Sequence, residues 1–246
     1  MQTVIDNVLL NYEILGNKKK NTILILHGWG RTKAEWFQTG KMLSDKYKVV
    51  LLDLPGFGGS LSMSKSSYDI YDYANLVNKF VKKLKINKLI LLGHSFGGKI
   101  SIVVASKNKT VQKLILVGSS GLKNKNRVLK IKKALLTILN TILSFLPIKT
   151  KDLLASFVRS KDYQNAGELT GTFKKVVKQH ITSEAKKIKI PTIIIWGEYD
   201  REVTLAMAKK LKDLISNSHL RIVWGSGHSP HLEKADSFYK ILRDYL

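Results

Sequence analysis

The residues of this chain that are best suited to chemistry surround one serine. Ser95 lies in the stretch LLGHSFGGK (residues 91–99), directly after an apolar run. Glycines two positions before and two after the serine allow a sharp turn from a strand into a helix, because a strained turn leaves no room for a Cβ there. Such a turn lifts the hydroxyl clear of a sheet, where it can act as a nucleophile.

A serine hydroxyl becomes a good nucleophile only when a base removes its proton and an acid fixes the tautomer of that base. Asp200 follows the apolar run 193–196, and His228 follows the next such run at 222–223. Loops at the carboxyl ends of parallel strands meet at one edge of the sheet. The sequence therefore predicts that Ser95, Asp200 and His228 converge as nucleophile, acid and base.

Two of these assignments have rivals nearby. Glu198 and Glu202 flank Asp200, and His231 competes with His228. The pattern G-x-x-D after the strand favours Asp200, and the Gly-Ser-Gly loop directly before His228 favours that histidine. His94 is expected to be a structural residue of the turn.

Short apolar runs alternate with longer segments of helical periodicity, which predicts a doubly wound, mostly parallel sheet flanked by helices, an α/β fold. The expected strands are 8–15, 22–26, 49–53, 88–92, 114–117, 190–196 and 220–223. The expected helices are 33–44, 68–84, 96–106, 204–215 and 235–246. Residues 1–120 and 189–246 are assigned to this core.

Residues 121–188 interrupt the alternation with helical sequence and predict a cap inserted over the sheet. The apolar run 134–146 has thirteen residues, fewer than the ~20 that a membrane span needs. Leu135, Leu139 and Ile142 of this run are expected to line an apolar pocket for an acyl chain. The cap is also basic, because residues 121–189 hold 16 Lys and Arg but only 4 Asp and Glu.

The composition excludes several classes of function. The chain has no cysteine, which rules out thiol catalysis, disulfides and thiolate metal sites. The net charge is +24, but most of the basic residues are lysines spread along the chain, which favours a solubility role over nucleic-acid binding. With no signal sequence or membrane span apparent, the expected location is the cytoplasm. The histidine spacing indicates no metal site.

Together these motifs resemble the α/β-hydrolase fold family over essentially the whole chain. The stretches HGWG (27–30) and DLPGFGGS (53–60) are also similar to that family. The resemblance implies an oxyanion hole made by the backbone N–H groups of Trp29 and Phe96, and it places His27 at the substrate site. Some members carry their acid in the loop that here holds Ser119 and Ser120, so that option is removed.

The resemblance implies a cofactor-independent serine hydrolase, with a carboxylesterase of small to medium acyl esters as the main expectation. A C–C bond hydrolase of the meta-cleavage type is an alternative, and a ligand receptor with little turnover is another. The HGWG loop also resembles carboxylesterases that act on acyl-carrier-protein methyl esters. An acidic carrier protein would therefore suit the basic cap as a partner.

Overall fold

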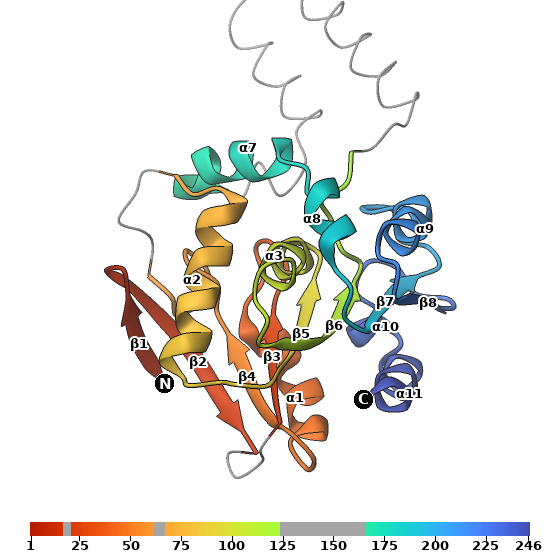
Figure 1. Cartoon of the computed structure of the whole chain (residues 1–246), viewed down its shortest axis with the longest axis horizontal. Coiled ribbons are helices and arrows are strands. Elements are labelled where there is room, and N and C mark those ends of the chain that lie inside the picture. The colour runs from red at the N-terminus through yellow and green to blue at the C-terminus, as the bar shows by residue number, and fades with distance from the viewer. Residues whose placement is uncertain (17–20, 62–66, 124–165) are drawn as a thin grey trace, which may run out of the picture.

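The computed structural model describes residues 1–16, 21–61, 67–123 and 166–246. In these ranges an eight-stranded sheet runs through the molecule in the order β1-β2-β4-β3-β5-β6-β7-β8 (Figure 1). The strands are β1 Gln2–Ile5, β2 Val8–Leu15, β3 Thr22–Leu26, β4 Lys48–Leu52, β5 Leu89–His94, β6 Val111–Val117, β7 Thr192–Gly197 and β8 Ser218–Val223. Strands β1 and β2 are antiparallel to their neighbours, and the other six are parallel. The predicted fold class is confirmed.

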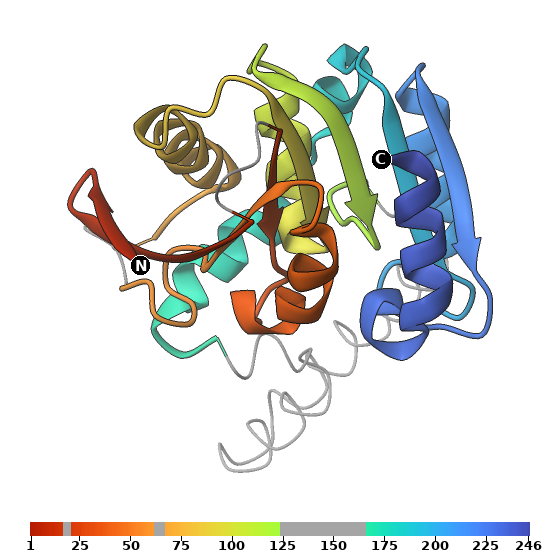
Figure 2. The same cartoon turned by 90° about the horizontal axis from the view of Figure 1, so that it is seen from below.

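Helices cover both faces of the sheet (Figures 1 and 2). They are α1 Phe37–Leu43, α2 Ile70–Lys83, α3 Phe96–Ala105, α7 Thr170–Lys178, α8 Thr182–Lys187, α9 Leu205–Leu214, α10 Pro230–Glu233 and α11 Ala235–Tyr245, with the 3₁₀ turns η1 Lys33–Trp36 and η3 Gly167–Leu169. None of the helices in the described ranges is long and apolar enough to cross a membrane.

Alternate residues of each strand enter two separate cores. On β3, Leu24 packs with residues of α2, α3, α8 and α9, whereas Ile25 packs with Trp36 of η1 and Phe238 of α11. This period of two follows from the pleat of a strand. Because both faces are buried, the central strands are nearly continuous in Val, Ile and Leu.

The expected elements differ from the observed ones in a few places. The strand β1 was not predicted, and it pairs with β2 through a tight turn in which Asp6 and Asn7 have φ of 49° and 61°. The single helix expected over 33–44 is split into η1 and α1. Strand β5 runs two residues further than expected, to His94, so it ends directly before Ser95.

The predicted cap is described only at its two ends, residues 121–123 and 166–188, where η3, α7 and α8 are helical as expected. The rest of the cap lies outside the described residues. The pocket residues Leu135, Leu139 and Ile142 are among those outside.

Candidate active site

Ser95 stands on the sharp turn between β5 and α3. Its φ of 50° and ψ of −109° are strained for a residue with a Cβ. The flanking glycines are required here, because a Cβ on Gly93 would collide with the carbonyl of Gly97, and a Cβ on Gly97 would collide with the carbonyl of Leu26. The predicted elbow is therefore present, and it is held by the Ser95 N–H, which donates to Val117 O at 2.9 Å.

Asp200 and His228 form a hydrogen-bonded pair at the same edge of the sheet. His228 Nδ1 lies 2.8 Å from Asp200 Oδ2. The other carboxylate oxygen of Asp200 accepts the N–H groups of Glu202 at 2.9 Å and Val203 at 2.8 Å. The carboxylate is fully buried. Asp200 is therefore fixed, and a carboxylate can only accept, so the hydrogen of this contact sits on His228 Nδ1 and the lone pair of the neutral ring is on Nε2.

The imidazole of His228 lies against the serine elbow through His94. The two rings are 4.9 Å apart between centroids, and His94 Nε2 lies 3.0 Å from the carbonyl oxygen of His228. On its other side, His228 Nε2 is 3.5 Å from Oε2 of Glu202, an exposed side chain. The loop of His228 is thus tied to the end of the strand that carries Ser95.

Two of the three rivals, Glu198 and His231, have other partners, and the third, Glu202, is an exposed side chain at the other ring nitrogen of His228. Glu198 accepts the N–H of Gly225 at 3.0 Å. His231 is buried and stacks on the ring of Trp36, with centroids 3.8 Å apart. Of the carboxylates that the sequence offered, Asp200 is the one that is buried and within hydrogen-bond distance of His228.

The two main-chain N–H groups expected to form an oxyanion hole are both available. Within the described part of the chain, neither Trp29 nor Phe96 finds an acceptor for its N–H, whereas the next one, Gly97 N–H, donates to His27 O at 3.1 Å. Phe96 is the first residue of α3, so the positive end of the helix dipole also points here. Free donors at a helix N-terminus can stabilise a negatively charged oxygen.

His27 has a different place from the one expected for a substrate-binding residue. It is fully buried. Its Nε2 accepts the N–H of Leu54 at 2.9 Å, so Nδ1 carries the hydrogen that meets Gly28 O at 2.7 Å. Burial lowers the pKa of His27, which keeps the ring neutral. His27 therefore joins the HGWG loop to the DLPG loop and does not line the cavity beside Ser95.

A cavity of about 680 Å³ opens beside Ser95. An aromatic group centred on Trp29 forms one wall, because its ring meets those of Phe96 at 5.2 Å and Phe173 at 5.1 Å. Val176 and Met207 add further apolar surface. A cavity of this kind suits an apolar substrate group of moderate size.

Sequence reasoning missed Lys99, which also lines this cavity. Its ammonium is buried and donates to the main-chain carbonyls of Val176 and Gln179, the latter at 2.7 Å. Burial lowers the pKa of Lys99 to about 8. A usable signal existed, since this lysine is the one charged residue in the first turns of a mostly apolar helix.

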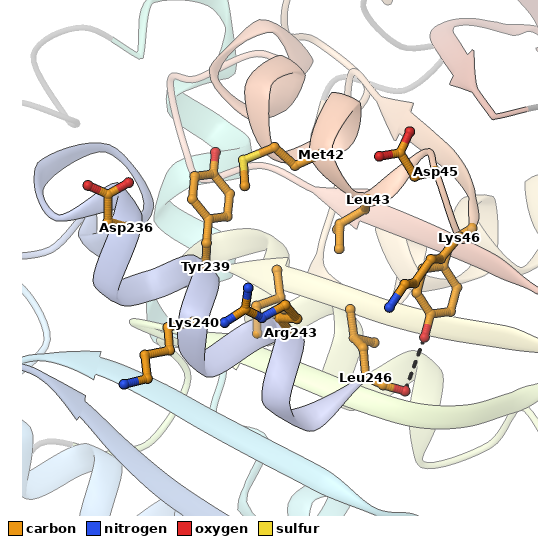
Figure 3. Close-up of a pocket in the computed structure, with 11 residues that line it drawn as sticks. Met42, Leu43, Asp45, Lys46, Asp236, Tyr239, Lys240, Arg243 and Leu246 are labelled. Atoms are coloured by element: carbon orange, nitrogen blue, oxygen red, sulfur yellow. Dashed lines mark hydrogen bonds between the residues drawn. The ribbon is translucent and has the colours of Figure 1, made fainter.

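A second cavity, of about 340 Å³, lies between α1 and α11 (Figure 3). Its walls include Leu43 and Tyr239, and Tyr47 Oη donates to Leu246 O at 3.0 Å beside it. The residues that line it include no serine, threonine or histidine. The cavity beside Ser95 is therefore the better candidate for catalysis.

The chain is similar in sequence and in fold to known hydrolases. Residues 21–147 match the family model of the alpha/beta hydrolase fold. The monoacylglycerol lipase ABHD6 of Bos taurus is 30% identical, with 92% of this chain and 75% of that protein aligned. A 2-hydroxy-6-oxononadienedioate/2-hydroxy-6-oxononatrienedioate hydrolase of Escherichia coli is 26% identical over 92% of this chain and 86% of its own length. A crystal structure of a membrane phospholipase A superposes with a TM-score of 0.79 at 25% identity, covering 99% of this chain and 85% of that one.

Proposed function

This chain is a hydrolase that belongs to the α/β-hydrolase fold family, and from that premise we propose that it cleaves carboxylic esters by a serine mechanism. The single observation that carries the proposal is the 2.8 Å contact between His228 and Asp200 beside the strained elbow of Ser95. A fixed acid, an oriented imidazole and an exposed hydroxyl are the parts that acyl transfer through an acyl-enzyme needs.

In the first step Ser95 Oγ bonds to the carbonyl carbon of the ester while its proton passes to His228 Nε2. Asp200 stabilises the imidazolium that forms and keeps the ring in place. The carboxylate of Glu202, 3.5 Å from Nε2, favours the same charged state. Collapse of the tetrahedral intermediate then expels the alkoxide, which leaves as the alcohol with the proton from His228, and the acyl group stays on Ser95.

The second step repeats this chemistry with water. His228 removes a proton from the water as the water oxygen attacks the acyl carbon, and Ser95 leaves with that proton. Both tetrahedral intermediates carry negative charge on the former carbonyl oxygen. The free N–H groups of Trp29 and Phe96 are suited to bind it, and the loss of one such donor typically costs ~10²–10³ in kcat.

The cavity beside Ser95 supports a medium-sized acyl or alcohol group as the apolar part of the substrate. Its volume of about 680 Å³ is within the usual range of small-molecule sites, about 300–1,000 Å³. The rings of Trp29, Phe96 and Phe173 give this wall a large apolar surface against which an acyl chain can pack. Monoacylglycerols, which the bovine relative is named for, belong in the first substrate panel.

A panel of p-nitrophenyl esters of increasing acyl length, together with monoacylglycerols, tests the proposal. We expect turnover with a maximum at intermediate length and a covalent acyl adduct on Ser95, detected by mass spectrometry after a rapid quench. Absence of turnover on every ester, or an adduct on another residue, would refute it.

A C–C bond hydrolase is the second candidate, because relatives with that activity in their names match the chain almost as well as the lipases do. Such enzymes cleave a carbon–carbon bond with a serine, a histidine and an aspartate like those proposed here. A 2-hydroxy-6-oxo-dienoate offered alongside the esters separates the two. The enzyme is an esterase if kcat/KM is higher for its best ester than for the dienoate, and the assignment is reversed if the dienoate is the better substrate.

A further inference from the structure

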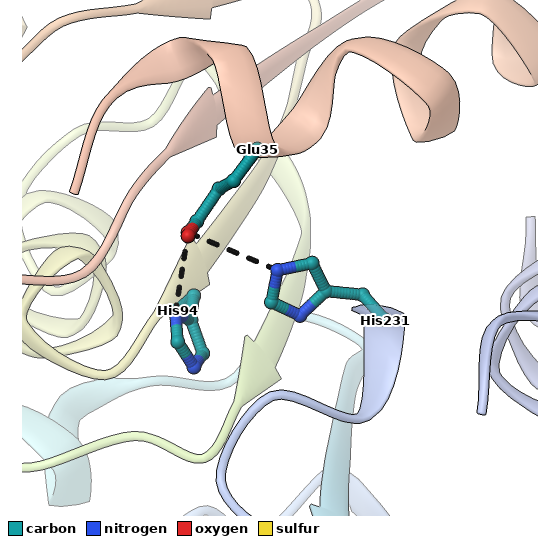
Figure 4. A group of neighbouring side chains, drawn as sticks. All are labelled: Glu35, His94 and His231. Atoms are coloured by element: carbon teal, nitrogen blue, oxygen red, sulfur yellow. Dashed lines mark ion pairs between the residues drawn. The ribbon is translucent and has the colours of Figure 1, made fainter. Parts of the chain in front are cut away.

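A buried cluster of Glu35, His94 and His231 lies next to the serine elbow (Figure 4). Glu35 comes from η1, His94 is the last residue of β5, and His231 belongs to α10. Glu35 Oε1 is 3.6 Å from His94 Nδ1 and 3.8 Å from His231 Nε2. Both histidines are only 2% exposed. Neither the family's triad nor the cavity beside Ser95 accounts for these three side chains.

One nitrogen of His94 is a hydrogen-bond donor. Its Nε2 lies 3.0 Å from the carbonyl oxygen of His228. Because a carbonyl oxygen can only accept, the hydrogen of this contact belongs to His94. His94 therefore ties the residue before the nucleophile to the main chain of the proposed base.

The other nitrogen of His94 faces an acceptor. Trp36 Nε1 donates to Glu35 Oε1 at 2.9 Å, which identifies that oxygen as an acceptor. Burial alone would raise the pKa of Glu35, but the contacts and charge of His231 and His94 outweigh it and hold the pKa below its usual range. A neutral His94 with its hydrogen on Nε2 would turn a lone pair toward this carboxylate. Two acceptors in contact in a buried place are unfavourable.

We propose that Glu35, whose Oε1 lies 3.6 Å from His94 Nδ1, favours a second proton on that nitrogen, and that His94, which donates through Nε2, fixes the loop of His228. Glu35 and His94 are then positioning residues for the base, an inference that rests on the proposed serine mechanism. Neither touches the substrate. Their effect is to hold the main chain of His228 against the strand end that carries Ser95.

The other titratable and charged groups near Glu35 do not compete with His94 for a proton. His231 is neutral near pH 7, because burial lowers its pKa to about 4. The guanidinium of Arg31 reaches Oε2 of Glu35 at 3.9 Å from an exposed position. His27 is neutral and already bonded at both nitrogens, and His228 bonds Asp200. Glu35 thus faces two buried histidines, of which His94 is the one that also bonds the main chain of His228.

A second support holds the same loop from its other side. Glu233 accepts the N–H of Gly227 at 2.6 Å and the N–H of Ser229 at 2.9 Å. The main-chain groups on either side of His228 are therefore bound by one carboxylate, and its own carbonyl is bound by His94. Glu233 holds only the two N–H groups that flank His228, so the peptide carbonyl of His228 needs a separate donor to fix its orientation. His94 supplies that donor.

The protonation of His94 can be read directly by NMR of protein labelled with ¹⁵N-histidine. At pH 7.5 we expect both ring nitrogens of His94 to carry a hydrogen, and Nδ1 to lose it in Glu35→Gln. This readout does not depend on turnover, so it decides the inference even if no ester is cleaved. A singly protonated His94 in the wild type would overturn it.

Kinetics of matched variants test the positioning role. Glu35→Gln and His94→Leu should lower kcat by roughly 10- to 100-fold, the scale of a small misplacement of a catalytic group, with little change in KM. His94→Gln, whose amide can still donate to the His228 carbonyl, should recover much of that loss. Glu184→Gln is the control, since Glu184 is also buried and hydrogen-bonded, to Tyr71 at 2.8 Å, but lies away from the site.

Two further outcomes would contradict the proposal. An unchanged kcat in both Glu35→Gln and His94→Leu would show that the loop needs no such support. One equivalent of bound Zn²⁺ that displaces the Nδ1 hydrogen and raises Tm would show that the three ligand atoms, which lie within 4.8 Å of one another, hold a metal and not a proton.

Discussion

His228 Nδ1 and Asp200 Oδ2 lie 2.8 Å apart, across loops that follow the neighbouring strands β7 and β8. The carboxylate cannot turn away from the imidazole, because two main-chain N–H groups hold its other oxygen. The orientation of His228 is thus set by the sheet itself, since both loops start from paired parallel strands.

Replacing Asp200 should show that this residue orients His228 for catalysis without being needed for folding. In Asp200→Asn the amide can present its N–H₂ to His228 and stabilise the wrong tautomer, so we expect kcat to fall by ~10⁴ with Tm nearly unchanged. Glu198→Gln serves as the control, because the Glu198 side chain accepts the Gly225 N–H, whereas it is Asp200 that bonds His228 Nδ1. An Asp200→Asn enzyme with more than a tenth of the wild-type kcat would argue against the assignment.

Removing the nucleophile should abolish covalent chemistry. Ser95→Ala is expected to lower turnover by roughly 10³- to 10⁶-fold and to abolish labelling by a fluorophosphonate probe. Ser106→Ala, at the far end of α3, should label like the wild type. Labelling of the Ser95→Ala protein at another serine would show that the nucleophile lies elsewhere.

Gly118 controls the place of His228 from the end of β6. Its φ is 49°, and a Cβ there would lie 3.2 Å from His228 Nδ1. Gly118→Ala should therefore cost about 1–2 kcal/mol of stability from the backbone alone and also lower kcat by pushing the imidazole off Asp200. Gly167→Ala is a matched control, with φ of 48° and no atom of the described residues within 4 Å of the added Cβ. Equal kcat in the two variants would contradict the expected collision.

The stability of the protein should fall between pH 6.5 and 4. The pKa of His231 is lowered from 6.5 to about 4 by burial, so in this interval the unfolded chain binds a proton that the folded chain refuses. Stability is then lost as the pH falls, by a total of order 3 kcal/mol. Glu35, whose pKa is also lowered when folded, adds a loss below about pH 4.5.

Urea unfolding at several pH values measures this slope. His231→Asn should flatten the curve between pH 6.5 and 4.5, whereas His219→Asn, at an exposed position, should leave it unchanged. A wild-type curve that is already flat in that interval would mean that His231 is not held neutral by the fold.

The local parts of the site were predictable from the sequence, because the signal is local. The GHSFG turn needs its glycines for steric reasons that act within a few residues, and Asp200 and His228 follow apolar strands whose carboxyl ends must share an edge. The strand β1 was missed although it had a signal: its hairpin turn is an Asp-Asn pair, a type that tolerates positive φ.

The cluster of Glu35, His94 and His231 was not predictable in this way. Its members are separated by dozens of residues, show no repeating interval, and meet only because η1 and α10 pack on the same end of β5. The burial of His27 and the contact of Lys99 with α7 were not predictable for the same reason. Each depends on the tertiary packing of elements that the sequence places separately.

Lys99 binds α7 through two main-chain carbonyls, those of Val176 and Gln179. Every amino acid carries such a carbonyl, so the attachment makes no demand on which side chains α7 presents to the cavity. The residues of α7 that line the cavity can therefore be substituted while the contact between α7 and Lys99 stays the same. The side chains of α7 that line the cavity are thereby independent of the contact that fixes α7 against α3, the helix that begins directly after Ser95.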